Sequence, residues 1–344
     1  MWYDSIIEKD IVPDALMRAG IRSLLRKRIA EETAPTNELQ QSRLMEFVHQ
    51  LKASPIAVLT AAANEQHYEV PTDFYLHVLG PRLKYSSCIW PDGITDLAAA
   101  ENAMLDETAR RAGIEDGHAI LDLGCGWGSF TLYAAARFRR SAVHAVSNSR
   151  TQKQFIDGRA RELGLTNVTV TTCDANTFET SERFDRIVSV EMLEHMRNYE
   201  SLFAKVAGWL KPDGRFFAHI FCHRTFAYPF ESTGDHDWMA RYFFSGGIMP
   251  SADLFHYFLK DLRLLEQWTV NGQHYEKTLN AWLARMDQSR RDIMPILAKA
   301  YGEDQSLKWW SYWRIFFMSC AELFGYDKGR EWFVAHYLFE KKTS

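Results

Sequence analysis

The feature that most constrains the fold is a regular alternation of short apolar runs and helical stretches, which begins near residue 118. Apolar or β-branched runs that predict strands occupy residues 119–123, 142–146, 168–172, 185–190, 215–220, 262–270 and 333–339. Helical stretches between the first five of them occupy residues 130–137, 151–163 and 202–210. Such alternation produces a mostly parallel sheet with helices on both faces. The sequence therefore predicts an α/β fold with a seven-stranded, mostly parallel sheet.

Further segments surround and interrupt this alternation. Apolar residues recur at helical spacing within residues 1–66, so we expect an N-terminal helical extension. Residues 67–344 then form the main domain, in which the segment 224–260 is expected to be an insertion that acts as a substrate lid. The segment 274–324 is predicted to be helical. Its aromatic cluster at 309–317 is interpreted as a packed core, and a hydrophobic substrate pocket is the alternative.

Charge, hydropathy and cysteine content narrow the class of protein. The 344 residues carry a net charge of −4, so no nucleic-acid partner is implied. No apolar run reaches the roughly 18–20 residues of a membrane span, and the first ten residues are too polar for a signal peptide. The five cysteines have no zinc-ligand spacing, so we expect no metal site and a cytoplasmic location. The oligomeric state stays open, a homodimer included.

A glycine-rich loop follows the first predicted strand and opens a helix. Residues 122–128 read DLGCGWG, and glycines allow a tight turn and close contact between a ligand and bare backbone. The spacing resembles the S-adenosylmethionine (SAM) motif of Rossmann-like class I methyltransferases, and it lacks the G-x-G-x-x-G spacing of a dinucleotide site. The resemblance implies SAM as cofactor, S-adenosylhomocysteine (SAH) as product, and contacts from Asp122, Gly124, Cys125, Gly126 and Gly128. A carboxylate here suits the ammonium group of SAM, whereas a pyrophosphate would disfavour it.

Several short motifs resemble the cyclopropane-fatty-acid-synthase family. Its signatures Y-[DE]-x-x-x-D-F-[YF], Y-S-C, E-M-F-E-H and H-Y-x-x-T-L-x-x-W resemble residues 68–75, 83–88, 190–196 and 274–282. Details within 221–251, and the glutamate at position 69, resemble the coclaurine and pavine N-methyltransferase branch of that family. The resemblance implies a SAM-dependent N-methyltransferase that acts on a small, aromatic or alkaloid-like amine.

Two more strand ends complete the predicted cofactor site. Most Rossmann-like sites carry an acid about 20 residues after the glycines, but here the second strand ends in Ser147 and Asn148, and Gln152 follows. By resemblance, these side chains face the ribose or the methionine part of SAM, and Ser149 is also a candidate helix N-cap. Asp174 ends the third strand, where similar enzymes bind the adenine amino group, and a solvated turn is the alternative. The resemblance adds Tyr85, Ser86, Ala175 and Val190 to the cofactor site.

Acidic and imidazole side chains gather after the fourth predicted strand. Glu191, Glu194 and His195 lie at the carboxyl end of that strand, where α/β sheets bind ligands. A secondary amine is mostly protonated near neutral pH, so a group that accepts its proton should raise the rate by about 10²–10⁴-fold. The resemblance assigns this role to Glu194 and His195, with Glu191 assisting. It places Tyr68 and Glu69 on the other side of the amine. A solvated turn is the alternative for the cluster.

The resemblance also defines an alternative function, a lipid-modifying enzyme of the cyclopropane-synthase type. Those enzymes hold bicarbonate as a base, and the positions of its ligands correspond here to Ser87, Glu194, His219, Phe221 and Tyr275. Ser87 replaces a cysteine and Phe221 replaces a smaller isoleucine, so we expect no bicarbonate site and favour methylation of a heteroatom. We predict that the acceptor pocket contains His219, Phe221, Tyr275 and Trp332, although a histidine in the core is an equal alternative for His219.

Overall fold

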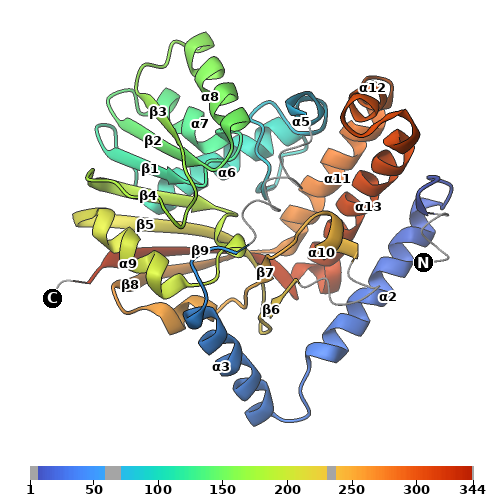
Figure 1. Cartoon of the computed structure of the whole chain (residues 1–344), viewed down its shortest axis with the longest axis horizontal. Helices are drawn as coiled ribbons and strands as arrows, with labels where there is room; N and C mark the ends of the chain where they lie inside the picture. Colours follow the sequence, from blue (N-terminus) through green and yellow to red (C-terminus); the bar gives the residue numbers. More distant parts are fainter. Residues whose placement is uncertain (1–6, 59–70, 231–237, 343–344) are drawn as a thin grey trace.

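A seven-stranded sheet forms the centre of the computed structural model, which describes residues 7–58, 71–230 and 238–342 (Figure 1). The strands are β1 (Ala119–Leu123), β2 (Ala142–Ser147), β3 (Val168–Thr172), β4 (Phe184–Val190), β5 (Leu210–His223), β8 (Leu262–Val270) and β9 (Trp332–Lys341). Their order is β3-β2-β1-β4-β5-β9-β8. Neighbouring strands from β3 to β5 are parallel, whereas β9 is antiparallel to β5 and β8. The predicted α/β fold is confirmed.

The strand order creates a crevice at one edge of the sheet. The chain runs outward from β1 through β2 to β3 and then crosses to β4 on the other side of β1. The loops that leave β1 and β4 therefore diverge, and α/β sheets bind ligands at such a switch point. The glycine loop follows β1 and the acidic cluster follows β4. Both predicted parts of the site thus meet at this edge.

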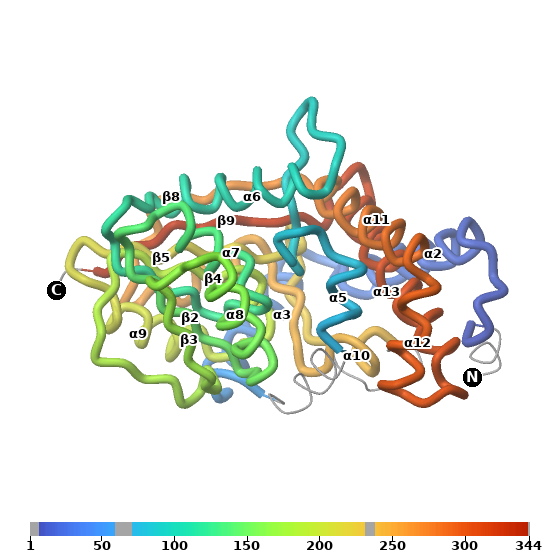
Figure 2. The backbone as a smooth tube through the Cα atoms, turned by 90° about the horizontal axis from the view of Figure 1, so that it is seen from above, coloured from blue at the N-terminus to red at the C-terminus, as the bar shows by residue number. Residues whose placement is uncertain are grey.

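Helices cover both faces of the sheet (Figure 2). One face packs against α6 (Leu97–Ala112), α7 (Ser129–Arg137) and α8 (Arg150–Glu162), and the other against α3 (Asn37–Ala53) and α9 (Tyr199–Trp209). The alternation of side chains along a strand explains this arrangement, because successive residues point to opposite faces. In β1, Ile120 belongs to the core beside α6, and Leu121 belongs to the core beside α9.

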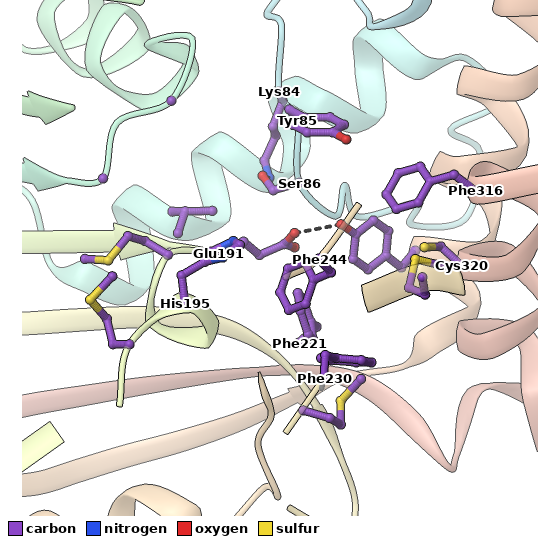
Figure 3. Close-up of a pocket in the computed structure, with 18 of the residues that line it drawn as sticks. Lys84, Tyr85, Ser86, Glu191, His195, Phe221, Phe230, Phe244, Phe316 and Cys320 are labelled. Atoms are coloured by element: carbon purple, nitrogen blue, oxygen red, sulfur yellow. Dashed lines mark hydrogen bonds between the residues drawn. The ribbon is translucent and has the colours of Figure 1, made fainter. Parts of the chain in front are cut away.

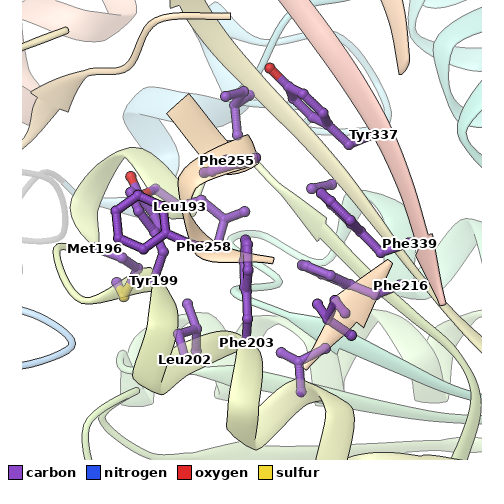
Figure 4. Close-up of a cluster of buried hydrophobic side chains, with 14 of the residues drawn as sticks. Leu193, Met196, Tyr199, Leu202, Phe203, Phe216, Phe255, Phe258, Tyr337 and Phe339 are labelled. Carbon is purple, nitrogen blue, oxygen red and sulfur yellow. The ribbon is translucent and has the colours of Figure 1, made fainter. Parts of the chain in front are cut away.

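An aromatic core between the sheet and α9 supports the turn after β4 (Figure 4). Phe216 of β5 stacks on Phe339 of β9 with ring centroids 5.6 Å apart. Tyr199 is fully buried, and its hydroxyl donates a 2.8 Å hydrogen bond to the carbonyl oxygen of Leu193. Leu193 begins the short 3₁₀ helix η1 (Leu193–His195). The core therefore fixes the segment that carries two of the predicted catalytic residues.

A group of helices stands beside the sheet and forms the far wall of the crevice. The predicted helical region consists of α11 (Gly272–Gln288), α12 (Arg290–Tyr301), η3 (Glu303–Gln305) and α13 (Ser306–Gly325), and the turn η4 (Tyr326–Gly329) precedes β9. Against them pack α5 (Thr72–Val78) and α2 (Asp14–Glu32). Most aromatic residues of the cluster at 309–317 are buried in this core, as predicted, and these are Trp310, Tyr312, Trp313 and Phe317.

Ion pairs hold α2 on α13. Arg18 lies 3.0 Å from Glu322, and Arg314 lies 2.9 Å from Asp14. The N-terminal helices are thus packed on the main domain. The predicted boundary at residue 66 falls outside the described residues and stays a prediction.

The insertion between β5 and β8 forms a small cap over the crevice. It contains β6 (Tyr228–Pro229), α10 (Trp238–Tyr242), β7 (Ile248–Met249) and η2 (Leu254–Phe258). β6 and β7 pair antiparallel, and α10 lies between the sheet and α2 in Figure 1. In the described part of the chain, no helix combines the length and the apolar character that crossing a membrane requires.

Candidate active site

A cavity of about 710 Å³ opens at the carboxyl ends of β1 to β4 and extends toward α2, α11 and α13. It brings together the predicted cofactor residues Tyr85, Ser86, Asp122, Gly124, Cys125, Gly126, Ser147, Asn148, Gln152, Asp174, Ala175 and Val190. These residues come from the ends of four neighbouring strands and from the segment before α6. Residues far apart in the sequence therefore meet in one lining.

The glycine loop combines bare backbone with close packing. Gly124 and Gly126 have φ values of +85° and +52°, which glycine adopts readily. A Cβ atom on Gly126 would have no heavy atom within 4 Å, so its backbone borders open space in the cavity, whereas one on Gly124 would lie 2.4 Å from Met192. Gly128, the remaining glycine of the predicted cofactor site, does not line the cavity. It precedes α7, and a Cβ there would lie 2.6 Å from Ile156.

Polar side chains at the ends of β1 and β2 are buried and hydrogen-bonded. Asp122 accepts a 2.6 Å hydrogen bond from the Thr131 hydroxyl, and burial raises the pKa of its carboxyl group to about 7. The Ser147 hydroxyl donates to the side-chain oxygen of Gln152 at 2.6 Å. Ser149 accepts from the backbone N–H of Gln152, so the predicted N-cap is confirmed.

Glu191 lines the cavity directly after β4, and three donors hold its carboxylate. Figure 3 draws one of these hydrogen bonds as a dashed line from Glu191. Oε1 accepts from the backbone N–H of Ser87 at 2.8 Å and from Nε2 of His219 at 3.1 Å. Oε2 accepts from the Tyr275 hydroxyl at 2.6 Å. Burial raises the pKa of Glu191, while the Lys84 ammonium and the hydrogen bonds from Tyr275 and Ser87 act in the opposite direction. The φ of Glu191 is +48°, an uncommon value for a residue with a side chain.

The structure separates the two residues that were predicted to handle the proton. His195 lines the cavity, and its ring lies 4.6 Å from that of Phe244. Glu194 is fully buried beneath the lining, and its Oε1 accepts from the backbone N–H of Phe221 at 2.7 Å. Burial and the charge of Glu191 raise the pKa of Glu194 well above its ordinary value. Outside the described residues lie the other two predicted catalytic residues, Tyr68 and Glu69.

Two of the four predicted pocket residues face the cavity, and two do not. Phe221 and Tyr275 line it. His219 is fully buried behind Glu191, so it belongs to the core that supports the lining. Trp332 also lies away from the lining, because it starts β9 with its side chain in the interior. Its Nε1 donates to the Tyr228 hydroxyl at 3.2 Å.

Three groups of lining residues were missed by the sequence analysis. They come from α2, the insertion and α13, and include Ile21, Leu24, Leu25, Arg28, Phe230, Trp238, Phe244, Cys320 and Phe324. Phe316 also lines the cavity, as the alternative interpretation of the aromatic cluster at 309–317 allowed. The apolar spacing in α2 was visible, but it was interpreted only as part of an N-terminal helical extension. The insertion was expected to act as a lid, and its aromatic residues were the available signal for an acceptor pocket.

The fold and the donor set define the class of protein. The backbone of the glycine loop borders the cavity, and Asp122 offers a buried carboxylate that fits the ammonium group of SAM. The lining continues with Asn148, Gln152 and Asp174 at the ends of β2 and β3, where the ribose and adenine of such a cofactor would lie. This site on this strand order is that of a class I SAM-dependent methyltransferase.

Comparison with known proteins gives the family. The family described as mycolic acid cyclopropane synthetase matches residues 58–330, and the chain belongs to it. The (S)-coclaurine N-methyltransferase of Thalictrum flavum subsp. glaucum is 40% identical over 98% of this chain and 94% of its own length. The enzyme of the same name from Papaver somniferum is also 40% identical, over 98% of this chain and 97% of its own length.

A solved structure supports the same assignment. The crystal structure of a coclaurine N-methyltransferase bound to N-methylheliamine and SAH has a TM-score of 0.95, with 38% identity and 98% coverage of both chains. The cyclopropane synthase MmaA2 from Mycobacterium tuberculosis has a TM-score of 0.69 at 23% identity, covers 82% of this chain and 98% of its own, and shares the fold. The chain is therefore a SAM-dependent N-methyltransferase.

Replacing Gly126 by valine should weaken SAM binding by roughly tenfold or more, equal to about 1.4 kcal/mol. The valine side chain would project into the space where backbone and ligand meet. Gly164→Val is the matched control, because Gly164 has a similar φ of +62° and open surroundings away from the cavity. Calorimetry with SAM should separate the two variants, and equal SAM affinity in both would contradict the placement of the loop.

The affinity for SAM should rise by up to about tenfold between pH 6 and pH 7.5 as Asp122 loses its proton. The pKa of Asp122 is raised to about 7, so the attraction to an ammonium group is weak below that pH and develops above it. Asp122→Asn keeps an acceptor for Thr131, and its affinity for SAM should be lower and should change less with pH. Titration calorimetry of both proteins across this range provides the measurement. A profile in the variant as steep as in the wild type would assign the pH dependence to another group.

Proposed function

We propose that the methyl acceptor is a small, aromatic, alkaloid-like amine whose nitrogen lies near Glu191 and His195. The single observation that carries this proposal is the hydrogen-bonded carboxylate of Glu191 beside an aromatic wall (Figure 3). That wall consists of Phe221, Phe230, Phe244, Phe316 and Phe324. A carboxylate attracts an ammonium group, and aromatic faces favour both a cation and the rings of the acceptor. The names of the coclaurine and pavine N-methyltransferases support the same acceptor class.

The proposed roles follow the position of each residue in the lining. SAM supplies an electrophilic methyl group with a neutral thioether as leaving group. Glu191 binds the ammonium form of the acceptor and orients it, and His195 accepts the proton that the nitrogen must lose. Glu194 supports the site from below through Phe221. On the cofactor side, Asp122 and the glycine loop hold the methionine part of SAM, and the ends of β2 and β3 hold the nucleoside.

The alternative function, modification of a lipid by cyclopropane-type chemistry, rests on the family description and on more distant relatives. The cyclopropane-fatty-acyl-phospholipid synthase of Escherichia coli (strain K12) is 31% identical over 64% of this chain. The bicarbonate that the family resemblance implies for this chemistry meets an obstacle in the cavity. Three of the positions that correspond to bicarbonate ligands in the lipid enzymes, Ser87 through its N–H, His219 and Tyr275, already donate hydrogen bonds to the carboxylate of Glu191. A free anion would have to compete with this attached one, so N-methylation is favoured.

A two-acceptor assay tests the proposal. The protein is incubated with labelled SAM and, separately, with a panel of aromatic secondary amines and with unsaturated phospholipid vesicles, each with and without added bicarbonate. We expect label in the amine products alone and no effect of bicarbonate. Label in cyclopropanated lipid, with a rate that rises with bicarbonate, would overturn the proposed function in favour of the alternative.

We also propose a cytoplasmic location, which the five free cysteines support. The oligomeric state stays open, and light scattering of the purified protein would show whether it forms a homodimer.

A further inference from the structure

A relay of four hydrogen-bonded side chains, Glu191, His219, His336 and Arg111, leads from the cavity through the sheet to helix α6. It starts at Glu191, whose Oε1 lies 3.1 Å from Nε2 of His219 on β5. Nδ1 of His219 lies 3.0 Å from Nε2 of His336 on β9. Nδ1 of His336 lies 2.8 Å from a terminal guanidinium nitrogen of Arg111 on α6, the helix that packs over these strands in Figure 2. Both histidines are fully buried, so the chain crosses the interior.

The donor and the acceptor of every hydrogen bond in this relay follow from the arginine side chain at its end. An arginine side chain only donates, so Nδ1 of His336 must accept. His336 then carries its proton on Nε2 and donates it to Nδ1 of His219. His219 in turn carries its proton on Nε2 and donates to Glu191. Each ring has one N–H, and all of the N–H groups point toward the carboxylate.

The surroundings keep both histidines neutral, as this order requires. Burial, together with the neighbouring charge of Arg111, holds the pKa of His219 and of His336 well below the ordinary value. A doubly protonated His336 would direct an N–H at the guanidinium group, which the 2.8 Å contact does not allow. Arg111 itself is anchored, because its Nε lies 2.6 Å from Glu107 and its guanidinium group lies over the ring of Trp268.

We propose that Arg111, His336 and His219 are positioning residues that orient the carboxylate of Glu191 and favour its ionised form. The inference rests on the proposed function, in which Glu191 binds the ammonium group of the acceptor. The aligned N–H dipoles direct their positive ends at Oε1, so an anion there is stabilised and its rotation is restricted. Oε2 is held separately by Tyr275. These hydrogen bonds thereby connect α6, on one face of the sheet, to the acceptor site.

Other groups also act on the charge of Glu191 and must stay unchanged in a test. They are Lys84, Cys88, Glu194, Tyr275 and Cys320. None of them contacts Arg111 or His336 through a hydrogen bond that the described residues show. Substitutions at positions 111 and 336 therefore change the relay and leave these groups in place.

The first arm of the test reads the histidine protons in the resting protein, without acceptor. Long-range ¹⁵N–¹H NMR spectra of histidine-labelled protein should show His219 and His336 with the proton on Nε2, assigned from the spectrum of His336→Gln. Arg111→Met should release His336 into a mixture of the two tautomers. Arg110→Met is the matched control, because Arg110 is the exposed neighbour that also pairs with Glu107. A proton on Nδ1 of either ring in the wild type, or no change in Arg111→Met, would overturn the proposal.

The second arm reads the effect on the site. His336→Phe keeps an aromatic ring but removes the acceptor and the donor, and it should lower kcat by about tenfold or more, as loss of a supporting hydrogen bond does elsewhere. It should also move the acidic limb of the pH–rate profile to higher pH. His336→Gln retains one acceptor and one donor, so we expect it to restore much of the rate and the wild-type profile. Calorimetry with SAM, which should give wild-type affinity, shows that each variant is folded.

The two arms distinguish failure of this inference from failure of the proposed function. If no amine is methylated but the tautomers respond to Arg111→Met as expected, the relay stands and the acceptor is wrong. If an amine is methylated and a folded His336→Phe variant keeps the wild-type pH–rate profile, the relay is overturned and the proposed function stands.

Discussion

Replacing Glu191 by glycine should lower kcat by ~10²-fold or more, because the acceptor loses the group that binds and orients its ammonium form, and misplacement of a reactant costs a factor of that size. The change leaves Ser87, His219 and Tyr275 pointing their donors at an empty position. The backbone should accept the change, because glycine suits the φ of +48° at this position. A small carboxylate such as formate should bind these donors and restore part of the activity.

The controls separate rescue from a general salt effect. Sodium chloride at the same ionic strength should restore nothing. Glu191→Gln fills the position without a charge, so formate should not rescue it. SAM affinity, measured by calorimetry, should stay near the wild-type value in both variants. Wild-type turnover by Glu191→Gly across pH 6–9 would contradict the role of this carboxylate in binding and orienting the acceptor.

The His195→Ala variant should lose activity, whereas the Glu194→Ala variant should lose stability. His195 lines the cavity, so His195→Ala should lower kcat by ~10²-fold with the midpoint of thermal unfolding and the affinity for SAM almost unchanged. Glu194 is buried and accepts from the N–H of Phe221, so Glu194→Ala leaves that N–H unpaired. Such a loss typically reduces the free energy of unfolding by about 1–3 kcal/mol. Kinetics and thermal unfolding of both variants measure the difference.

Glu194→Gln decides how the buried acid acts. Glutamine retains an oxygen for the Phe221 N–H and resembles the protonated form, which burial favours. We expect it to keep most of the stability and most of the activity. If Glu194→Gln loses as much activity as His195→Ala at unchanged stability, Glu194 carries a necessary charge, and the division of roles between the two residues is wrong.

The sequence was sufficient for the parts of the site that local chain geometry determines. The glycine loop, the Ser147 to Gln152 segment and Asp174 each follow a strand whose apolar pattern is clear, and parallel strands place their carboxyl ends together. Their convergence in one lining therefore followed from the order of elements. Gly128 was the exception, because the same motif position serves packing against Ile156.

The sequence was insufficient wherever the orientation of a side chain depends on a turn or a distant contact. The E-x-x-E-H motif suggested similar roles for its members, but η1 directs Glu194 into the core and leaves His195 on the cavity. The three donors of Glu191 come from residues 87, 219 and 275, and no local pattern relates them. Trp332 could not be oriented because the faces of β9 depend on its pairing between β5 and β8.

The pairing of α2 with α13 has a consequence for how the protein is made. Arg18 and Glu322 are separated by 304 residues, so at the usual speed of translation of about 5–20 residues per second, α2 leaves the ribosome roughly 15–60 s before its partner exists. During that time Ile21, Leu24 and Leu25 have no cavity wall to join. We expect chaperones to bind this helix in the nascent chain and α2 to dock last.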